Sequence, residues 1–184
     1  MIVKKAVAFA EAAHRGAVRK GTNIPFITHP LDTAVIVASL TEDKELIAAA
    51  VLHDVVEDAG VKEGELREIF GDRVTDLVMA ETEDKTKSWA ERKAATLDHL
   101  VHASREEKIL VLGDKLSNIR STARDYMLLG EVFWNRFNEK RKERHQWYYE
   151  GVAERLKELA DYPQYQEYQR LCRLVFHEQE CFLG

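Results

Sequence analysis

The sequence has few of the residues that interrupt helices. Among its 184 residues there are only three prolines and nine glycines. Proline removes a backbone donor and glycine loses more conformational entropy on folding, so their scarcity favours long helical segments. Long apolar runs are absent too. Nowhere do about 18 apolar residues follow one another, so we expect no membrane span.

Cysteine is equally scarce. Cys172 and Cys181 are the only two, and neither has metal-ligand partners at a useful spacing. We therefore expect both to be thiols in a reducing compartment. The alanine-rich start of the chain soon reaches Glu11 and His14 and carries no signal-peptide cleavage pattern. The cytoplasm is the expected location, with no membrane partner.

An excess of positive charge is also missing. Lysine and arginine number 27 against 32 acidic residues, which gives a formal net charge of −5. Non-specific nucleic-acid binders are normally basic, so we do not expect nucleic acid as a partner. A small anionic substrate remains compatible with this charge, because a basic cleft can lie on an acidic protein. The oligomeric state is not indicated.

Apolar residues recur at helical spacing along most of the chain. The length suits one domain, and no segment alternates as a strand does. Thr28 is a candidate cap for the second helix, and Trp147 a candidate packing residue. The predicted helices cover residues 2–15, from 28 onward, 43–56, 63–70, 72–81, 88–103, 105–128, 131–160 and 163–178. We predict an all-α single domain of about eight to ten helices, with a core over 5–155 and a C-terminal helical extension over 156–184.

Two ionisable residues, His53 and Asp54, close a helix that is otherwise apolar from Leu46 to Leu52. A helix that is apolar all round is expected to be buried. A carboxylate buried beside a histidine without compensation is expensive. A divalent cation would compensate, because imidazole and carboxylate both donate to it. Glu57 and Asp58 follow one turn later and make this helix end densely acidic.

His29 and Asp114 are the further candidates. His29 follows a basic loop, and Asp114 interrupts an apolar run, with Asn118 one helical turn later. Each alone has an ordinary explanation, such as a helix cap, an ion pair with Lys115 or a solvated helix end. Their joint occurrence is what indicates a metal site, because they appear in the order His, His-Asp, Asp with apolar flanks. The predicted ligands are His29, His53, Asp54 and Asp114.

These motifs resemble the HD superfamily, and more narrowly the hydrolase domain of the RelA/SpoT family and its stand-alone form, the small alarmone hydrolases. The resemblance covers roughly residues 5–155. Gly113 and Ser117 depart from it, since relatives usually have alanine at the first and histidine or tyrosine at the second. The stretches that carry it are 19–22 (RKGT), 25–30 (PFITHP), 52–58 (LHDVVED), 70–74 (FGDRV), 83–86 (EDKT), 91–93 (ERK) and 112–120 (LGDKLSNIR).

The resemblance implies a metal-dependent enzyme that removes the 3′-pyrophosphate of guanosine tetra- or pentaphosphate, (p)ppGpp, giving GDP or GTP and pyrophosphate. The implied metal is Mn²⁺, with Fe²⁺, Co²⁺ or Zn²⁺ as alternatives. By position, Glu57 and Asp58 would orient and deprotonate the attacking water. The implied substrate-binding residues are Arg19 and Lys20 at the base, Asn118 near the ribose, and Arg92, Lys93 and Arg144 at the phosphates.

Three other readings stay open. The same metal site could serve a phosphatase acting on a deoxynucleoside monophosphate or on a ribose phosphate of a dinucleotide. The domain could instead be a non-catalytic nucleotide sensor, although Glu57 and Asp58 argue against this because a sensor needs no water-activating pair. A helical interaction module without a site would leave the buried charges unexplained. The cations Arg92, Lys93 and Arg144 could equally be solvated helix faces.

Overall fold

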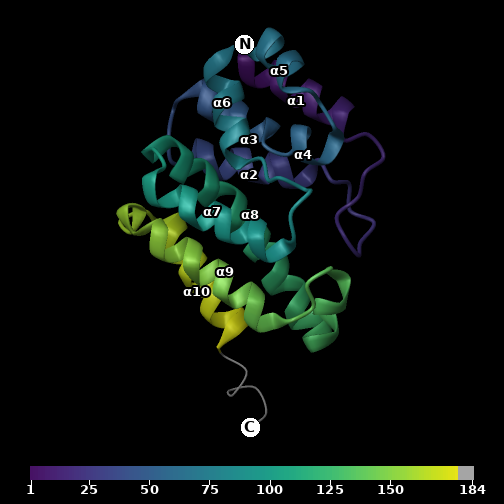
Figure 1. Cartoon of the computed structure of the whole chain (residues 1–184), viewed down its shortest axis with the longest axis vertical. Coiled ribbons are helices and arrows are strands. Elements are labelled where there is room, and N and C mark those ends of the chain that lie inside the picture. The colour runs from purple at the N-terminus through teal and green to yellow at the C-terminus, as the bar shows by residue number, and fades with distance from the viewer. Residues whose placement is uncertain (178–184) are drawn as a thin grey trace.

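The computed structural model describes residues 1–177, whose regular elements are helices joined by loops (Figure 1). It contains ten α-helices, two short 3-10 helices and no β-strand beyond an isolated bridge between Val18 and Pro25. The predicted all-α bundle is confirmed. The helices are α1 (Ile2–Ala13), α2 (Thr28–Ala38), α3 (Lys44–Leu52), α4 (Val55–Ala59), α5 (Glu63–Phe70), α6 (Asp72–Glu81), α7 (Trp89–His102), α8 (Arg105–Leu129), η1 (Gly130–Arg136), α9 (Lys142–Arg155), η2 (Lys157–Leu159) and α10 (Pro163–Phe176).

The long helix α8 is the centre of the fold. It packs against α2, α3 and α6 on one side and against α10 on the other, and it lies between these two groups in Figure 1. Its apolar residues are buried on several faces, including Leu110, Leu112, Leu116 and Ile119. A helix in this position can hold a polar side chain in the interior only where a partner compensates the lost hydration.

Side-chain caps fix where several helices begin. Ser88 and Ser104 each form a capping box with the glutamate three residues later, at the starts of α7 and α8. Asp43 accepts hydrogen bonds from two backbone N–H groups at the start of α3. The expected cap by Thr28 is wrong. Thr28 is the first residue of α2, and its hydroxyl donates to the carbonyl of Pro25 instead (2.8 Å).

The predicted continuous helix over 43–56 is two helices. α3 ends at Leu52, and α4 begins at Val55. The Nδ1 atom of His53 lies 2.8 Å from the carbonyl oxygen of Ala50, an oxygen that would otherwise serve the α-helical ladder. A side chain that inserts into the ladder breaks a helix locally. The break places His53 and Asp54 at a corner, so Glu57 and Asp58 belong to a separate short helix.

The predicted helix over 131–160 is also wrong. α8 ends at Gly130, whose φ of 59° is a left-handed value that other residues rarely adopt. The chain continues as η1, an irregular connection, α9 and η2. This interruption rotates the buried face of α9, so that Tyr148 is 3% exposed whereas the candidate packing residue Trp147 is 42% exposed.

The C-terminal helix α10 packs along α8 and α9. Its buried residues, among them Tyr165, Tyr168 and Cys172, join the same hydrophobic core as the earlier helices. Cys172 is a free thiol, as expected, whereas Cys181 and the predicted helix end at 178 lie outside the described residues. The division into a core and an extension over 156–184 stays a prediction. Within residues 1–177, no helix is long and apolar enough to cross a membrane.

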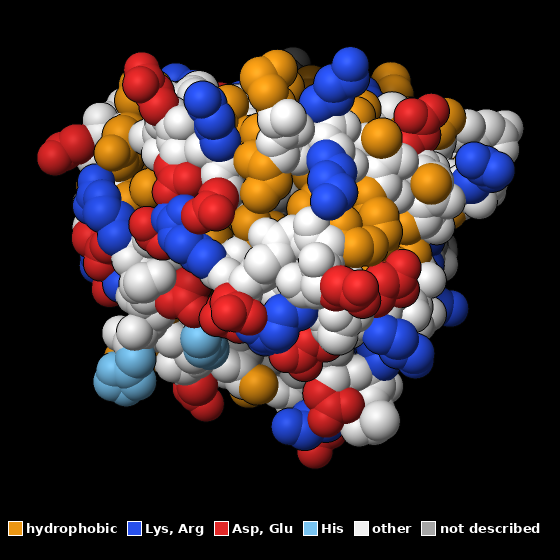
Figure 2. All heavy atoms as spheres, turned by 90° about the horizontal axis from the view of Figure 1, so that it is seen from above, with side chains coloured by type: hydrophobic (Ala, Val, Ile, Leu, Met, Phe, Trp, Pro, Cys, Tyr) orange, Lys and Arg blue, Asp and Glu red, His pale blue; other side chains and the backbone are white. Residues whose placement is uncertain are grey.

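The surface around α1 and α5 is of mixed charge. Acidic and basic side chains alternate there, with hydrophobic side chains between them (Figure 2). Arg67 joins α5 to α6 through Glu63, Asp72 and Asp76, all within 2.9 Å. Arg73 reaches Asp43, Glu45 and Glu106 within 2.8 Å and so ties α6 to α3 and α8. Shared among several carboxylates, each arginine contributes more than an isolated surface pair would.

Gly113 lets α2 and α8 approach closely. A Cβ atom at this position would lie 2.6 Å from Cγ2 of Val37 and 3.2 Å from the carbonyl oxygen of Thr33. Valine is stiff at χ1 and the Thr33 oxygen belongs to a helix backbone, so neither can move away easily. A larger residue at position 113 therefore separates the helices that carry His29 and Asp114.

We predict opposite results for the same substitution at two glycines. Gly64→Ala, where a Cβ meets nothing within 4 Å, should stabilise the protein by up to about 1 kcal/mol through helix propensity. In Gly113→Ala, overpacking should cost about 1–3 kcal/mol and cancel the gain from helix propensity. This variant should therefore be less stable than Gly64→Ala. Urea denaturation of both variants tests this. Equal gains in unfolding free energy would contradict the close contact.

Candidate metal centre

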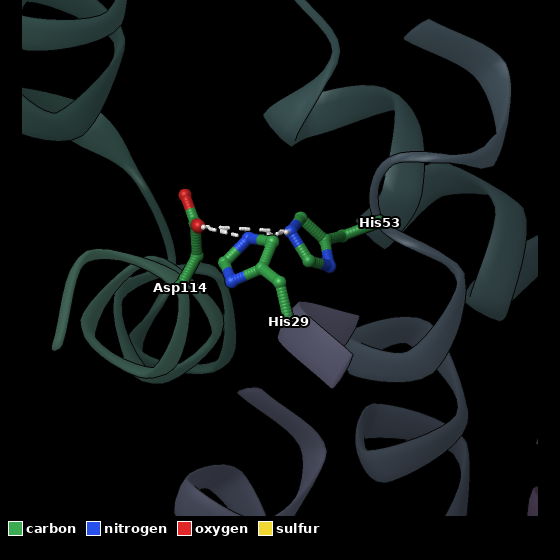
Figure 3. Close-up of side chains that lie close together, drawn as sticks. All are labelled: His29, His53 and Asp114. Carbon is green, nitrogen blue, oxygen red and sulfur yellow. Dashed lines mark hydrogen bonds and ion pairs between the residues drawn. The ribbon is translucent and has the colours of Figure 1, made fainter. Parts of the chain in front are cut away.

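Three separate parts of the chain bring ionisable side chains to one point in the interior. His29 lies in the first turn of α2, His53 and Asp54 lie at the corner between α3 and α4, and Asp114 lies in the middle of α8. Both histidines and Asp114 are buried. The side chains of His29, His53 and Asp114 point toward one another from α2, the α3–α4 corner and α8 (Figure 3).

The ligand atoms of these residues form a tight group. One donor atom from each of His29, His53 and Asp114 lies within 4.8 Å of the other two. The two Nε2 atoms are 3.2 Å apart, and Oδ1 of Asp114 is 3.0 Å from His29 Nε2 and 3.6 Å from His53 Nε2. Oδ2 of Asp54 lies 3.5 Å and 3.2 Å from the same two nitrogens. The four residues predicted as ligands are thus brought together.

The other nitrogen of each imidazole has its own partner. Nδ1 of His53 lies 2.8 Å from the carbonyl oxygen of Ala50, which can only accept, so Nδ1 carries a proton. Nδ1 of His29 lies 2.9 Å from the hydroxyl of Ser117. The bond to Ala50 fixes the tautomer of neutral His53, and in both residues it is Nε2 that faces the cluster. This arrangement is typical of histidines that bind a metal.

The electrostatics of the cluster require a positive charge. Burial alone would lower the pKa of His53, but the carboxylates of Asp54 and Asp114 raise it well above its ordinary value. At His29 burial dominates and lowers the pKa. Burial would raise the pKa of Asp54, yet His53 brings it down to about 2. Without a metal, a proton on His53 compensates the negative charge of the two carboxylates. A divalent cation bound by the two imidazoles and two carboxylates would compensate it as well.

Asp114 is held from its outer side by two neighbours on α8. Its Oδ2 accepts a hydrogen bond from the ammonium of Lys115, and its Oδ1 accepts one from Asn118 (2.6 Å). The amide oxygen of Asn118 in turn accepts a hydrogen bond from Arg19 (2.9 Å). Lys115 therefore pairs with the neighbouring acid, and Asn118 links the cluster to the basic loop.

Glu57 and Asp58 lie on α4, one helical turn beyond the corner. Burial raises the pKa of Glu57, whose Oε2 accepts a hydrogen bond from the backbone N–H of Glu83 (3.2 Å). Asp58 is more exposed and pairs with Lys85 (2.5 Å). A carboxylate with a raised pKa near a metal site has the properties of a general base. Glu57 is therefore a stronger candidate for the general base than Asp58.

The three cations assigned to phosphates occupy two different settings. Arg92 and Lys93 both bind the carboxylate of Glu83, at 3.0 Å and 2.6 Å. Arg92 also approaches Glu57 (3.9 Å), so these two cations lie on the Glu57 side of the cluster. Arg144 is exposed on α9. Their assignment to the substrate stays a prediction.

A cavity of about 400 Å³ opens beside the cluster. His29, Ser117 and Asn118 line the end near the candidate metal ligands, and Arg19 and Lys20 line one wall. Further lining comes from η1, the chain after it and α9, and it includes Trp134, Arg136, Phe137 and Tyr149. Its size and mixture of aromatic and cationic side chains suit a nucleotide.

Sequence reasoning missed several residues that shape this site. Glu83 was noted only as part of a motif, yet it joins Arg92, Lys93 and Glu57. Glu81 is also near the cluster, and burial raises its pKa to about 7. The cavity wall from η1 was missed because a single long helix was predicted there. The aromatic density of residues 133–149 was the available signal, but it does not reveal which side chains face the cavity.

Comparison with known proteins places the chain in a family. The family model for the HD domain matches residues 6–126. The guanosine-3′,5′-bis(diphosphate) 3′-pyrophosphohydrolase MESH1 of Danio rerio is 37% identical over 126 residues, which cover 67% of this chain and 70% of that protein. A GTP pyrophosphokinase of Streptomyces coelicolor is 40% identical over 123 residues, 65% of this chain but only 14% of that protein.

Two solved structures share the fold. A metazoan ortholog of SpoT, described as hydrolysing ppGpp, superimposes with a TM-score of 0.79 over 94% of both chains at 24% identity. The Listeria monocytogenes protein lmo0812 superimposes with a TM-score of 0.74 at 35% identity, over 80% of this chain and 98% of that one. The matched residues include all four that converge at the cluster. The chain belongs to the HD-domain family.

Proposed function

We propose that this protein is a divalent-metal-dependent phosphohydrolase that removes the 3′-pyrophosphate of (p)ppGpp, giving GDP or GTP and pyrophosphate. The observation that carries the proposal is the convergence of His29, His53, Asp54 and Asp114, with both Nε2 atoms directed inward. The relatives named as 3′-pyrophosphohydrolases support the substrate, as does a cavity of nucleotide size beside the cluster. The cytoplasmic location expected from the sequence stays a prediction.

The four residues would hold one divalent cation. A mixture of two imidazoles and two carboxylates suits Mn²⁺, and also accepts Fe²⁺, Co²⁺ or Zn²⁺. When bound, such an ion polarises a phosphate oxygen and lowers the pKa of water in its coordination sphere. Asn118 and Lys115, which bond to Asp114, keep this carboxylate oriented toward the site.

The residues of the chain supply the proton transfer and the positioning. Glu57 would accept a proton from the attacking water, with Asp58 helping to orient it. The water oxygen bonds to phosphorus, the bond between phosphorus and the 3′ oxygen breaks, and that oxygen receives a proton. Arg92 and Lys93 would stabilise the charge of the departing pyrophosphate. Arg19 and Lys20 would hold the base, and Asn118 the ribose.

We predict that metal binding depends on the cluster. Adding Mn²⁺ to metal-stripped protein at about 100 times its dissociation constant should stabilise the fold by about 2.7 kcal/mol. Asp54→Ala should abolish both Mn²⁺ binding by calorimetry and the rise in Tm. Asp98→Ala, which removes an exposed aspartate of α7, is the matched control and should keep both. A full rise in Tm in the Asp54 variant would contradict the assigned site.

We predict that Glu57→Gln separates catalysis from metal binding. Loss of the general base should lower kcat for ppGpp hydrolysis by about 10²–10⁴-fold, measured as pyrophosphate release with Mn²⁺. The Mn²⁺-dependent rise in Tm should persist, because Glu57 is not one of the four proposed ligands. Glu65→Gln, an exposed position on α5, should leave the rate unchanged.

A substrate panel tests the proposed reaction against its alternatives. It contains ppGpp, a deoxynucleoside monophosphate and a dinucleotide with a phosphate on its ribose. Turnover of ppGpp alone supports the proposal. Turnover of another compound of the panel instead of ppGpp would contradict the proposed substrate and support a phosphatase. Tight nucleotide binding without turnover by the metal-loaded protein would favour a non-catalytic nucleotide sensor.

A further inference from the structure

Part of the lining of the cavity beside the four candidate metal ligands comes from residues that follow the family match. The match stops at residue 126, whereas η1, the chain after it and α9 contribute Trp134, Arg136, Phe137 and Tyr149 to the lining. His29 and Asn118 line the same cavity as Arg136 and Phe137. A ligand that fills the cavity would touch both His29 and this part of the lining.

Positive charge gathers in the cavity lining around Asp125. Arg124 and Arg136 bind opposite oxygens of Asp125, at 2.8 Å and 2.6 Å. Burial would raise the pKa of Asp125, but these two hydrogen bonds hold it below its ordinary value, so the carboxylate is charged. With Lys20 on the facing loop the formal charge is three cations minus one anion, or +2. The other lining acid, Asp32, lies 3.6 Å from Arg120.

The position of Arg136 is fixed by packing on three sides. Its guanidinium lies over the ring of Phe133, 5.4 Å from the centroid. Its side chain crosses to the basic loop, where a Cβ atom on Gly21 would come within 2.6–2.9 Å of its Cγ, Cδ and Nε atoms. Only Nη1 donates a hydrogen bond to the described residues, and its acceptor is Asp125. The guanidinium is thus held in place at the cavity with donors to spare.

We infer that Arg136 and Arg124 form a binding subsite for a second phosphate group of the nucleotide, the one that is not cleaved, beside Lys20, which stays assigned to the base. The inference rests on the proposed function for the identity of the nucleotide, in which the uncleaved group is the 5′-diphosphate. A guanidinium presents paired N–H groups that match phosphate oxygens, and a local charge of +2 matches a phosphate dianion. η1 would then select nucleotides that are phosphorylated at two positions.

The first test is direct binding, which needs no turnover. Calorimetric titration of the protein with GDP and with guanosine measures how much the 5′-diphosphate contributes to the binding free energy. Arg136→Gln should weaken GDP binding by about tenfold or more, the effect of losing a hydrogen bond to a charged group, and leave guanosine binding unchanged. Arg136→Lys, which keeps the charge, should recover part of the loss. Arg124→Gln, at an exposed side chain that folding does not require, should shift GDP binding in the same direction.

Arg141→Gln is the matched control. Arg141 is exposed, pairs with the nearby Glu139 as Arg136 pairs with Asp125, and does not line the cavity. It should bind GDP as the unchanged protein does. Equal GDP affinity in the Arg136 and Arg124 variants and the unchanged protein would overturn the inference, as would an equal loss in the Arg141 variant.

Hydrolysis distinguishes this inference from the proposed function. With ppGpp as substrate, Arg136→Gln should raise KM by about tenfold with little change in kcat, because binding energy remote from the reacting bond is lost. A substrate with a 3′-diphosphate but no 5′ phosphate should have the same KM in both proteins. If ppGpp is not hydrolysed but GDP binding still depends on Arg136, the proposed function fails and the subsite stands. Hydrolysis with a KM independent of Arg136 would overturn the subsite alone.

Discussion

Two carboxylates and two imidazoles meet in the interior where α2, the α3–α4 corner and α8 come together, and this concentration of charge constrains the rest of the site. Buried carboxylates are stable only if hydrogen bonds and an opposite charge replace their hydration. The protein supplies part of this through Lys115 and Asn118 on Asp114. The remaining negative charge has to be compensated between the two Nε2 atoms, where a proton or a divalent cation can reside.

The fold accommodates this cluster by local departures from regular structure. The helix that carries His53 breaks there, because the imidazole bonds to the carbonyl of Ala50. On α8, Gly113 brings the helix close to α2, so Asp114 reaches His29. The Ser117 hydroxyl then holds the second nitrogen of His29. Each of these features orients a candidate ligand atom, as the outer contacts of a metal site do.

The cations around the cluster divide into two groups with different partners. Arg92 and Lys93 are held by Glu83, which also contacts Glu57, so one loop residue organises the side of the site where a proton would be taken up. Arg124 and Arg136 share Asp125 in the lining of the cavity. A common metal centre with different walls is how one fold can serve several substrates. In this chain part of the cavity lining comes from residues that follow the family match.

The sequence by itself determined the fold class, most helix positions and the candidate ligands. Apolar periodicity reports local burial, and a charged residue within an apolar run, such as Asp114 or the His53-Asp54 pair, stands out without any structure. The predictions failed where long-range packing overrides local pattern. The break at His53 and the interruption after Gly130 depend on side-chain contacts and backbone conformation that periodicity does not encode.

Only the tertiary structure decided which distant residues share a space. Glu83 meets Arg92 because the connection between α6 and α7 folds over α4, and Arg136 meets Lys20 and Gly21 because η1 turns back toward the basic loop. Arg136 and Gly21 lie 115 positions apart along the chain. No spacing rule connects such positions. Their proximity follows from how α8 and the helices around it pack, and that packing minimises exposed apolar surface over the whole chain at once.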